Sequence, residues 1–146
     1  MIVEKNHSKT DSSTLTFLST SKRCKIHACI WHPDKTKYAK PIGIIQIAHG
    51  MVDHIERFED MALYFTKRGF LVVGNDHLGH GDSIASKDDW GYFADHKDCG
   101  TYLVKDMHKL TKIIKKEYPN LPYVLIGHSM GSFLTRKYMM MYKDEL

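Results

Sequence analysis

The stretch that decides the fold is Leu121-Pro122-Tyr123-Val124-Leu125-Ile126-Gly127-His128-Ser129-Met130-Gly131-Ser132. A short β-prone run leads directly into a serine between two glycines, and apolar residues at helical spacing follow it. This order of strand, turn and helix predicts a nucleophile elbow, a sharp turn that lifts the Ser129 hydroxyl clear of the sheet. Gly127 and Gly131 fit such a turn because side chains at these two positions would collide with the crossing chain.

Outward from this motif, the sequence predicts strands that alternate with helices. Residues 13–18 and 24–31 alternate polar and apolar side chains and predict an antiparallel pair, whereas the apolar run 42–48 predicts a central strand buried on both faces. Another strand is expected over residues 70–76. One helix is predicted by the apolar stripe Ile55, Phe58, Ala62 and Phe65, with Asp53 as the expected cap and Gly69 past its end. A second helix, which Pro119 ends, is predicted by the stripe Leu103, Met107, Leu110 and Ile114.

This order predicts an α/β fold with a mostly parallel sheet, an N-terminal antiparallel pair and helices on both faces. Sites in such sheets lie beyond the carboxyl ends of the strands. His49, Asp76 and Ser129 all follow predicted strands, so we expect them to lie at one edge of the sheet. No repeat or linker divides residues 1–146, which we interpret as part of one domain.

Composition excludes several classes of function. With 42% hydrophobic and 26% charged residues, the sequence is typical of a globular chain, and its net charge of +4 comes from scattered lysines, which predicts no nucleic-acid partner. The three cysteines lack C-x-x-C spacing, which favours reduced intracellular thiols over disulfides or a zinc site. The N-terminus lacks a secretory signal and no run could span a bilayer, so we expect a cytoplasmic chain.

The chemistry expected at Ser129 is attack on an ester or thioester carbonyl. The resulting oxyanion needs two fixed N–H donors. The sequence offers the amide of Met130, after the nucleophile, and the amide of Met51, which follows His49 and Gly50 at a predicted strand end. An ordinary strand-end turn is the alternative interpretation of residues 49–51.

Three ordered motifs, residues 49–51, 76–83 and 127–131, resemble the N-terminal half of the α/β-hydrolase superfamily, closest to its monoacylglycerol lipase and lysophospholipase branch. The resemblance covers nearly everything after residue 10. It implies a serine esterase that acts on small lipid esters, namely single-chain acylglycerols or lysophospholipids. Ser129 would be the nucleophile and Met51 and Met130 the oxyanion donors, with no cofactor and no metal.

Two histidine features have competing interpretations. Asp76, His77, His80 and Asp82 could bind a metal on a loop, but the resemblance implies that this loop is a structural brace beside the active site. His128 could act as a base, but neighbouring side chains diverge on a sharp turn, so we expect it to support the turn instead.

A complete triad runs serine, acid, histidine along the chain in this superfamily. No histidine follows His128, and the only later carboxylates, Asp144 and Glu145, lie at the far end of the helix that begins at the serine. We therefore expect an amino-terminal, nearly inactive portion of a hydrolase. The C-terminal strands and the lid would be absent from this chain. Any transient membrane contact of the parent protein would be made through that lid.

Two other functions remain open at this point. The chain could be a non-catalytic binding or assembly module that uses the open edge of strand 123–126. Alternatively, the parent could be an aminopeptidase or thioesterase on the same scaffold, because the substrate would be decided by the missing lid.

Overall fold

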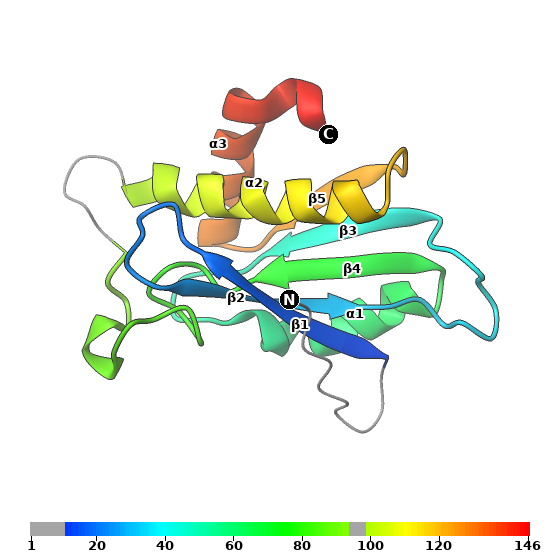
Figure 1. The fold of residues 1–146 in the computed structure, drawn as a ribbon, viewed down its shortest axis with the longest axis horizontal. Coiled ribbons are helices and arrows are strands. Elements are labelled where there is room, and N and C mark those ends of the chain that lie inside the picture. Colours follow the sequence, from blue (N-terminus) through cyan, green and yellow to red (C-terminus); the bar gives the residue numbers. More distant parts are fainter. Residues whose placement is uncertain (1–10, 94–98) are drawn as a thin grey trace.

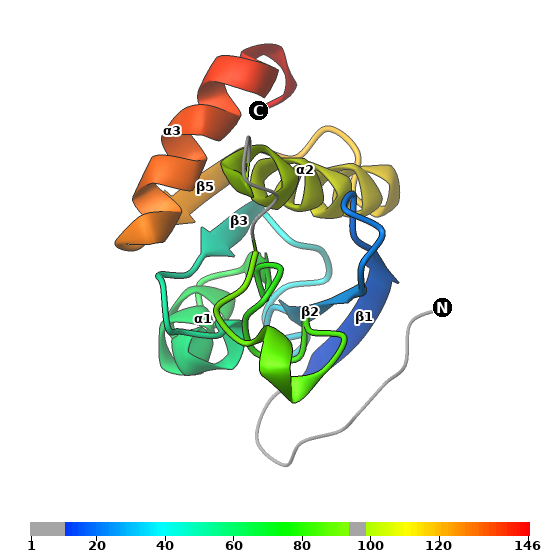
Figure 2. The same cartoon turned by 90° about the vertical axis from the view of Figure 1, so that its left-hand side faces the viewer.

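The computed structural model describes residues 11–93 and 99–146, which form one five-stranded sheet with helices on both faces. The strands are β1 (Ser12–Leu18), β2 (Lys25–Trp31), β3 (Gly43–Ala48), β4 (Phe70–Asn75) and β5 (Tyr123–Gly127). The helices are α1 (Glu59–Thr66), α2 (Cys99–Glu117) and α3 (Met130–Tyr142), with short 3-10 helices η1 (Ile55–Phe58), η2 (Lys87–Asp89) and η3 (Lys143–Glu145). Figures 1 and 2 show α2 and α3 on one face of the sheet and α1 on the other.

The strand order is β1-β2-β4-β3-β5, and the sheet is mixed. β1 pairs antiparallel with β2, and β2 with β4, whereas β3 pairs parallel with both β4 and β5. The predicted α/β fold and its N-terminal antiparallel pair are thereby confirmed. Ile47 is level with Gly74 and Ala48 with Gly127, so the residues that follow the three parallel strands meet at one edge, as the sequence predicted.

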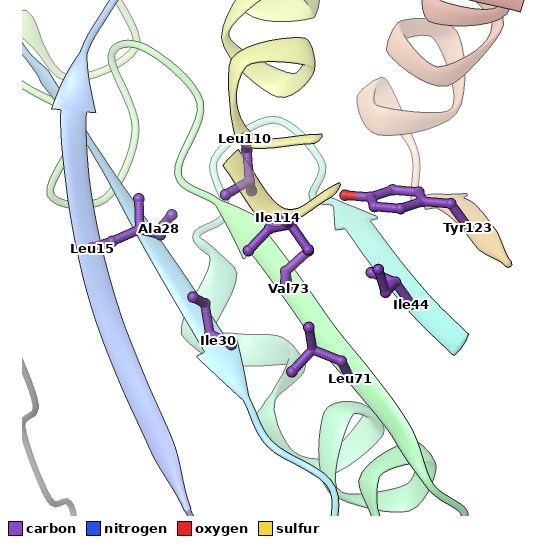
Figure 3. Close-up of a cluster of buried hydrophobic side chains, with 9 residues drawn as sticks. All are labelled: Leu15, Ala28, Ile30, Ile44, Leu71, Val73, Leu110, Ile114 and Tyr123. Carbon is purple, nitrogen blue, oxygen red and sulfur yellow. The ribbon is translucent and has the colours of Figure 1, made fainter. Parts of the chain in front are cut away.

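Apolar packing on both faces fixes the centre of the sheet. All six residues of β3 are buried, in agreement with the predicted central strand. Figure 3 shows Leu110 and Ile114 of α2 directed at Val73 and Leu71 of β4, with Ile44 beside them. The opposite face is covered by η1 and α1; its cluster includes Ile55, Ala62, Ile45, Ile47 and Val72. Each fully buried aliphatic side chain contributes about 1.5–3 kcal/mol to stability.

A buried polar network ties both helices of one face to the sheet. Gln46 on β3 donates from its amide nitrogen to the Met107 carbonyl at 3.0 Å. Its amide oxygen accepts hydrogen bonds from the hydroxyls of Thr111 and Tyr123. Tyr138 of α3 donates to the Thr111 hydroxyl at 3.0 Å. Since a buried amide without partners is costly, this network favours one placement of α3, the helix that begins after Ser129.

The helix predicted from residue 55 is real, but its expected cap is wrong. The residue at the N-cap of η1 is His54, and the Asp53 carboxylate accepts the His54 amide at 2.9 Å and pairs with Arg57 at 3.5 Å. The Ile55 amide instead donates to Asp76 Oδ1 at 2.7 Å. A carboxylate at the end of β4 therefore satisfies the first donor of η1, and this long-range partner has no local signature in the sequence.

Part of the apolar surface of α3 and β5 is exposed in the described chain. Leu134 and Tyr138 of α3 pack inward, but Phe133 is 68% exposed although it belongs to the same apolar pattern. β5 forms one edge of the sheet, and its Val124 is half exposed. The open edge expected from the sequence is therefore present.

No helix within residues 11–93 and 99–146 combines the length and the apolar character needed to cross a membrane.

Candidate active site

Ser129 stands in a strained backbone conformation at the junction of β5 and α3. Its φ of 52° and ψ of −120° place it in a region that residues with a side chain rarely adopt. Two hydrogen bonds hold this turn. The His128 amide donates to the Ala48 carbonyl at 3.0 Å, and the side-chain hydroxyl of Ser132 donates to the Ser129 carbonyl at 2.6 Å. The residue is exposed, so the turn presents its hydroxyl to the outside of the sheet edge.

The two glycines of the motif allow the chain to cross itself. A Cβ on Gly131 would lie 2.0 Å from the Ala48 carbonyl oxygen and 2.8 Å from that of His49. A Cβ on Gly127 would lie 2.4 Å from the Gly131 carbonyl oxygen. These neighbours are backbone atoms, which cannot rotate away. Glycine is thus sterically required at both positions, for the reason the sequence suggested.

The loop after β3 lies directly against the elbow. A Cβ on Gly50 would be 3.1 Å from Ser129 Cβ and 3.2 Å from His128 Nδ1. The absence of a side chain at this position lets the peptide between Gly50 and Met51 approach the serine. The next residue, Val52, has a φ of 55° and is 89% exposed, an uncommon conformation for a β-branched residue.

His49 fixes the orientation of that peptide. Its Nε2 accepts the His77 amide at 2.9 Å, so the ring proton is on Nδ1, which donates to the Gly50 carbonyl at 2.7 Å. In a trans peptide the N–H points away from the carbonyl. The Met51 N–H therefore points away from the buried His49 ring, on the side of the peptide opposite its hydrogen-bonded oxygen.

Two backbone donors beside the elbow are without partners. Among the hydrogen bonds of the described residues, none uses the amide of Met51 or that of Met130. Met130 is the first residue of α3, where free amides and the helix dipole favour a negative charge. These are the two amides that the sequence analysis named as oxyanion donors, and that role stays a prediction.

The loop after β4 is organised around the Asp76 carboxylate. Asp76 is buried and accepts hydrogen bonds from the amides of Ile55 and Asp82 and from His27 Nδ1, at 2.7, 2.9 and 3.2 Å. Burial alone would raise the pKa of Asp76, but these hydrogen bonds outweigh it and lower the pKa. Gly81 has a φ of 49° and its Cβ would be 2.3 Å from Asp76 Oδ2. The oxygens of Asp76 are thus engaged in bracing the loop.

The partner that sequence analysis missed in this brace is His27. It lies on β2, and the sequence considered only the apolar residues of that strand. Its hydrogen bond to Asp76 raises the pKa of the His27 imidazole, although burial acts in the opposite direction. The only local signal was a histidine at a position that alternates with the apolar face of β2.

Two buried histidines, His49 and His77, lie with their ring centroids 4.1 Å apart and their planes tilted by 41°. Burial lowers the pKa of both imidazoles, and the nearby rings lower that of His77 further. Both are therefore neutral near pH 7, which keeps His49 Nε2 available as an acceptor.

Because His49 and His77 are held neutral in the folded chain, we expect the protein to lose stability in mild acid. Because their folded pKa values lie below the unfolded value of about 6.5, the unfolded chain takes up protons first as the pH falls. The raised pKa of His27 acts in the opposite direction: its stabilising contribution grows as the pH falls and is complete below about pH 6.5, so it offsets part of this loss. We expect the free energy of unfolding, measured with urea, to fall by about 1 kcal/mol from pH 7.5 to 5.5, because two imidazoles resist protonation in the folded chain and one favours it. A His77→Gln variant should lose part of this slope; an unchanged stability across the range would contradict the assignment.

No base is hydrogen-bonded to Ser129 in the described part of the chain. His128 is exposed, and its ring lies edge-on to that of Phe58, with centroids 5.9 Å apart. Glu145, at the other end of α3, pairs with His108 at 2.6 Å. The structure thus agrees with the expectation that neither late carboxylate reaches the serine.

The fold and the elbow define the class of the protein as an α/β hydrolase. The sequence model of the family described as serine aminopeptidase S33 matches residues 39–146. The chain belongs to this family.

Several relatives agree with this assignment. The monoglyceride lipase homolog of Monkeypox virus is 35% identical over 106 residues, which cover 68% of this chain and 35% of that protein. The monoacylglycerol lipase of Mycolicibacterium smegmatis is 33% identical over 116 residues, which cover 80% of this chain and 38% of that protein. The expected resemblance to the monoacylglycerol lipase branch is confirmed, and the chain spans little more than a third of these relatives.

Among solved structures, a thermostable carboxyl esterase from Bacillus coagulans in complex with glycerol superimposes with a TM-score of 0.82. It is 36% identical, and the match covers 92% of this chain and 42% of the esterase.

Proposed function

We propose that the protein to which this chain belongs is a serine hydrolase of carboxylic esters, acting on monoacylglycerol-like or lysophospholipid-like substrates. Ser129 is the nucleophile, and the amides of Met51 and Met130 stabilise the oxyanion. His49, Gly50, Gly127, His128 and Gly131 support the elbow and the loop of residues 49–52, which is called the oxyanion loop below.

The observation that carries this proposal is the strained conformation of Ser129 between two unpartnered amides. A residue with a side chain at a φ of 52° costs conformational free energy. Strained residues of this kind are concentrated at functional sites. Two main-chain donors near an exposed hydroxyl are the arrangement that stabilises the tetrahedral intermediate of acyl transfer.

The surface beside the oxyanion loop suits an apolar substrate. A pocket of about 530 Å³ is lined by the oxyanion loop and by residues near Trp90. Val52 and Trp90 are 89% and 60% exposed there. Together with relatives named monoglyceride lipase homolog and monoacylglycerol lipase, this apolar surface favours a lipid ester over a peptide amide as the substrate.

The chain as given is proposed to be a nearly inactive portion of that hydrolase. Without a hydrogen-bonded base, the Ser129 hydroxyl stays protonated at neutral pH and is a weak nucleophile. The triad acid and histidine would be supplied by the part of the relatives' length that this chain does not span.

A comparison of kcat/KM for ester and amide substrates tests this proposal. The complete protein is expected to hydrolyse a long-chain monoacylglycerol or a lysophospholipid with a kcat/KM at least about 100-fold above that for an amino-acid arylamide. The 146-residue chain, assayed in parallel, is expected to hydrolyse none of them measurably. Faster cleavage of the arylamide would favour the aminopeptidase alternative, which the name of the matching family supports. Turnover by the 146-residue chain that Ser129→Ala abolishes would overturn the inactive-portion proposal.

A further inference from the structure

A second group of reactive side chains lies on the face of the sheet covered by η1, away from the elbow. A ring nitrogen of His27, the Cys29 sulfur and a Glu56 carboxylate oxygen lie within 4.8 Å of one another. His27 and Cys29 are two residues apart on β2 and therefore project to the same face. Glu56 comes from η1, which packs over that face. These three residues are called the β2–η1 cluster below.

The acceptor groups of this cluster are not used elsewhere. Among the hydrogen bonds and ion pairs of the described residues, none involves the Cys29 sulfur or the Glu56 carboxylate. His27 Nδ1 is bonded to Asp76 at 3.2 Å, which leaves Nε2 as the ring nitrogen open to a ligand. A thiol, an imidazole nitrogen and a carboxylate have thus been brought together from two elements without pairing with one another.

The Asp76–His27 hydrogen bond has the form found behind metal-binding histidines. A carboxylate that accepts the far N–H of an imidazole fixes the ring and makes its other nitrogen a better ligand. Asp76 itself is buried and held by the amides of Ile55 and Asp82, so the orientation of His27 is set before any ion arrives.

We propose that His27, Cys29 and Glu56 form a binding site for one divalent transition-metal ion of the zinc class. Nitrogen, sulfur and oxygen ligands in a set of three, with a fourth position left for water, match the preferences of zinc. Cys29 and Glu56 line a pocket of about 330 Å³, which would give a water molecule access to the fourth position. The sequence analysis expected no metal because the cysteines lack C-x-x-C spacing and the resemblance implied none, and it did not consider these three residues together.

The distances require only a small adjustment. Ligand atoms around a tetrahedral zinc ion lie roughly 3.3–3.8 Å apart, about 1 Å closer than the limit of the cluster. Glu56 is exposed and can move inward, whereas His27 and Cys29 are fixed by β2. The ligand form of Cys29 is the thiolate, so binding releases the thiol proton to solvent.

An ion at this site would tie η1 to β2. Because η1 follows the oxyanion loop by only a few residues, the metal would restrict the segment that leads away from Met51. The proposed role is therefore structural, and its test does not depend on the hydrolase proposal.

Cobalt titration of the purified protein, kept reduced with a phosphine, tests the proposal directly. Co²⁺ is expected to bind with one-to-one stoichiometry and to give a near-ultraviolet thiolate-to-metal band that added Zn²⁺ removes. Cys29→Ser should abolish the band, and Glu56→Gln, at an exposed position, should weaken binding at least about tenfold. Zn²⁺ should also raise the melting temperature of the wild type but not of Cys29→Ser.

Matched variants separate this site from adventitious binding. Cys24→Ser removes another buried thiol, and Cys99→Ser the third cysteine; Glu59→Gln removes a carboxylate that lines the same pocket. These variants should keep the band and the affinity. A folded protein with no thiolate band, a band that depends on Cys24 or Cys99, or equal affinity of Glu56→Gln and wild type would each overturn the proposal.

Discussion

Ser129→Ala in the complete protein is expected to lower kcat for ester hydrolysis by about 10⁶-fold. The substitution removes the atom that forms the acyl bond, whereas the amides of Met51 and Met130 and the substrate surface remain. What survives should therefore be a slow, water-dependent reaction assisted by the oxyanion donors alone. The measurement is kcat with a monoacylglycerol under saturating conditions, together with KM, which should change little.

Ser132→Ala is the matched control for this variant. Ser132 lies one turn further along α3, and its hydroxyl donates to the Ser129 carbonyl instead of facing the proposed substrate surface. Its loss should change kcat far less than the loss of Ser129. Equal activity of Ser129→Ala and wild type would show that another residue is the nucleophile.

Gly131→Ala is expected to destabilise the fold by at least about 3 kcal/mol and to remove activity from whatever protein remains folded. The added methyl would lie 2.0 Å from the Ala48 carbonyl oxygen and 2.6 Å from its carbon, so β3 or the start of α3 must move. Such a movement would also displace the Met130 amide. We expect the melting temperature to fall by roughly 10 °C.

Gly100→Ala provides the same chemical change at a permissive site. Gly100 lies in α2, where an added Cβ would approach nothing closer than the Lys137 side chain at 3.8 Å. Alanine in a helix is more stable than glycine by about 0.5–1 kcal/mol, so this variant should melt at a slightly higher temperature. If Gly131→Ala were as stable and as active as Gly100→Ala, the crossing of the chain described for the elbow would be wrong.

The elbow and the edge of the sheet were predictable because each is encoded in a short, contiguous segment. Gly127, Ser129 and Gly131 lie within five residues, and the apolar runs at β3, β4 and β5 define strands whose carboxyl ends must meet. The contact between Gly127 and Gly131 is local, so the sequence pattern carries it, whereas the close approach of Gly131 to Ala48 follows from the pairing of β3 with β5.

Polar contacts between distant elements could not be predicted in the same way. The sequence placed the cap of η1 on Asp53, but the Ile55 amide bonds Asp76, which lies 21 residues away. The pairing of Asp76 with His27 depends on the antiparallel alignment of β2 with β4, which pattern alone does not specify. The β2–η1 cluster was missed for the same reason, since Cys29 and Glu56 meet only when η1 folds over the sheet.

The role of His49 could be predicted only in part from the sequence. The sequence placed it at the end of a predicted strand, directly before Gly50 and Met51. Its two hydrogen bonds, which determine the ring tautomer and orient the Met51 amide, required the three-dimensional positions of His77 and Gly50.

The most direct test of the central claim is a crystal structure of the complete protein after reaction with a fluorophosphonate, supported by mass spectrometry of the labelled peptide. Our account predicts a covalent bond between phosphorus and Ser129 Oγ, with the phosphonyl oxygen within hydrogen-bonding distance of the amides of both Met51 and Met130. A phosphonate on another residue, or an oxygen that contacts neither amide in a correctly folded protein, would contradict it.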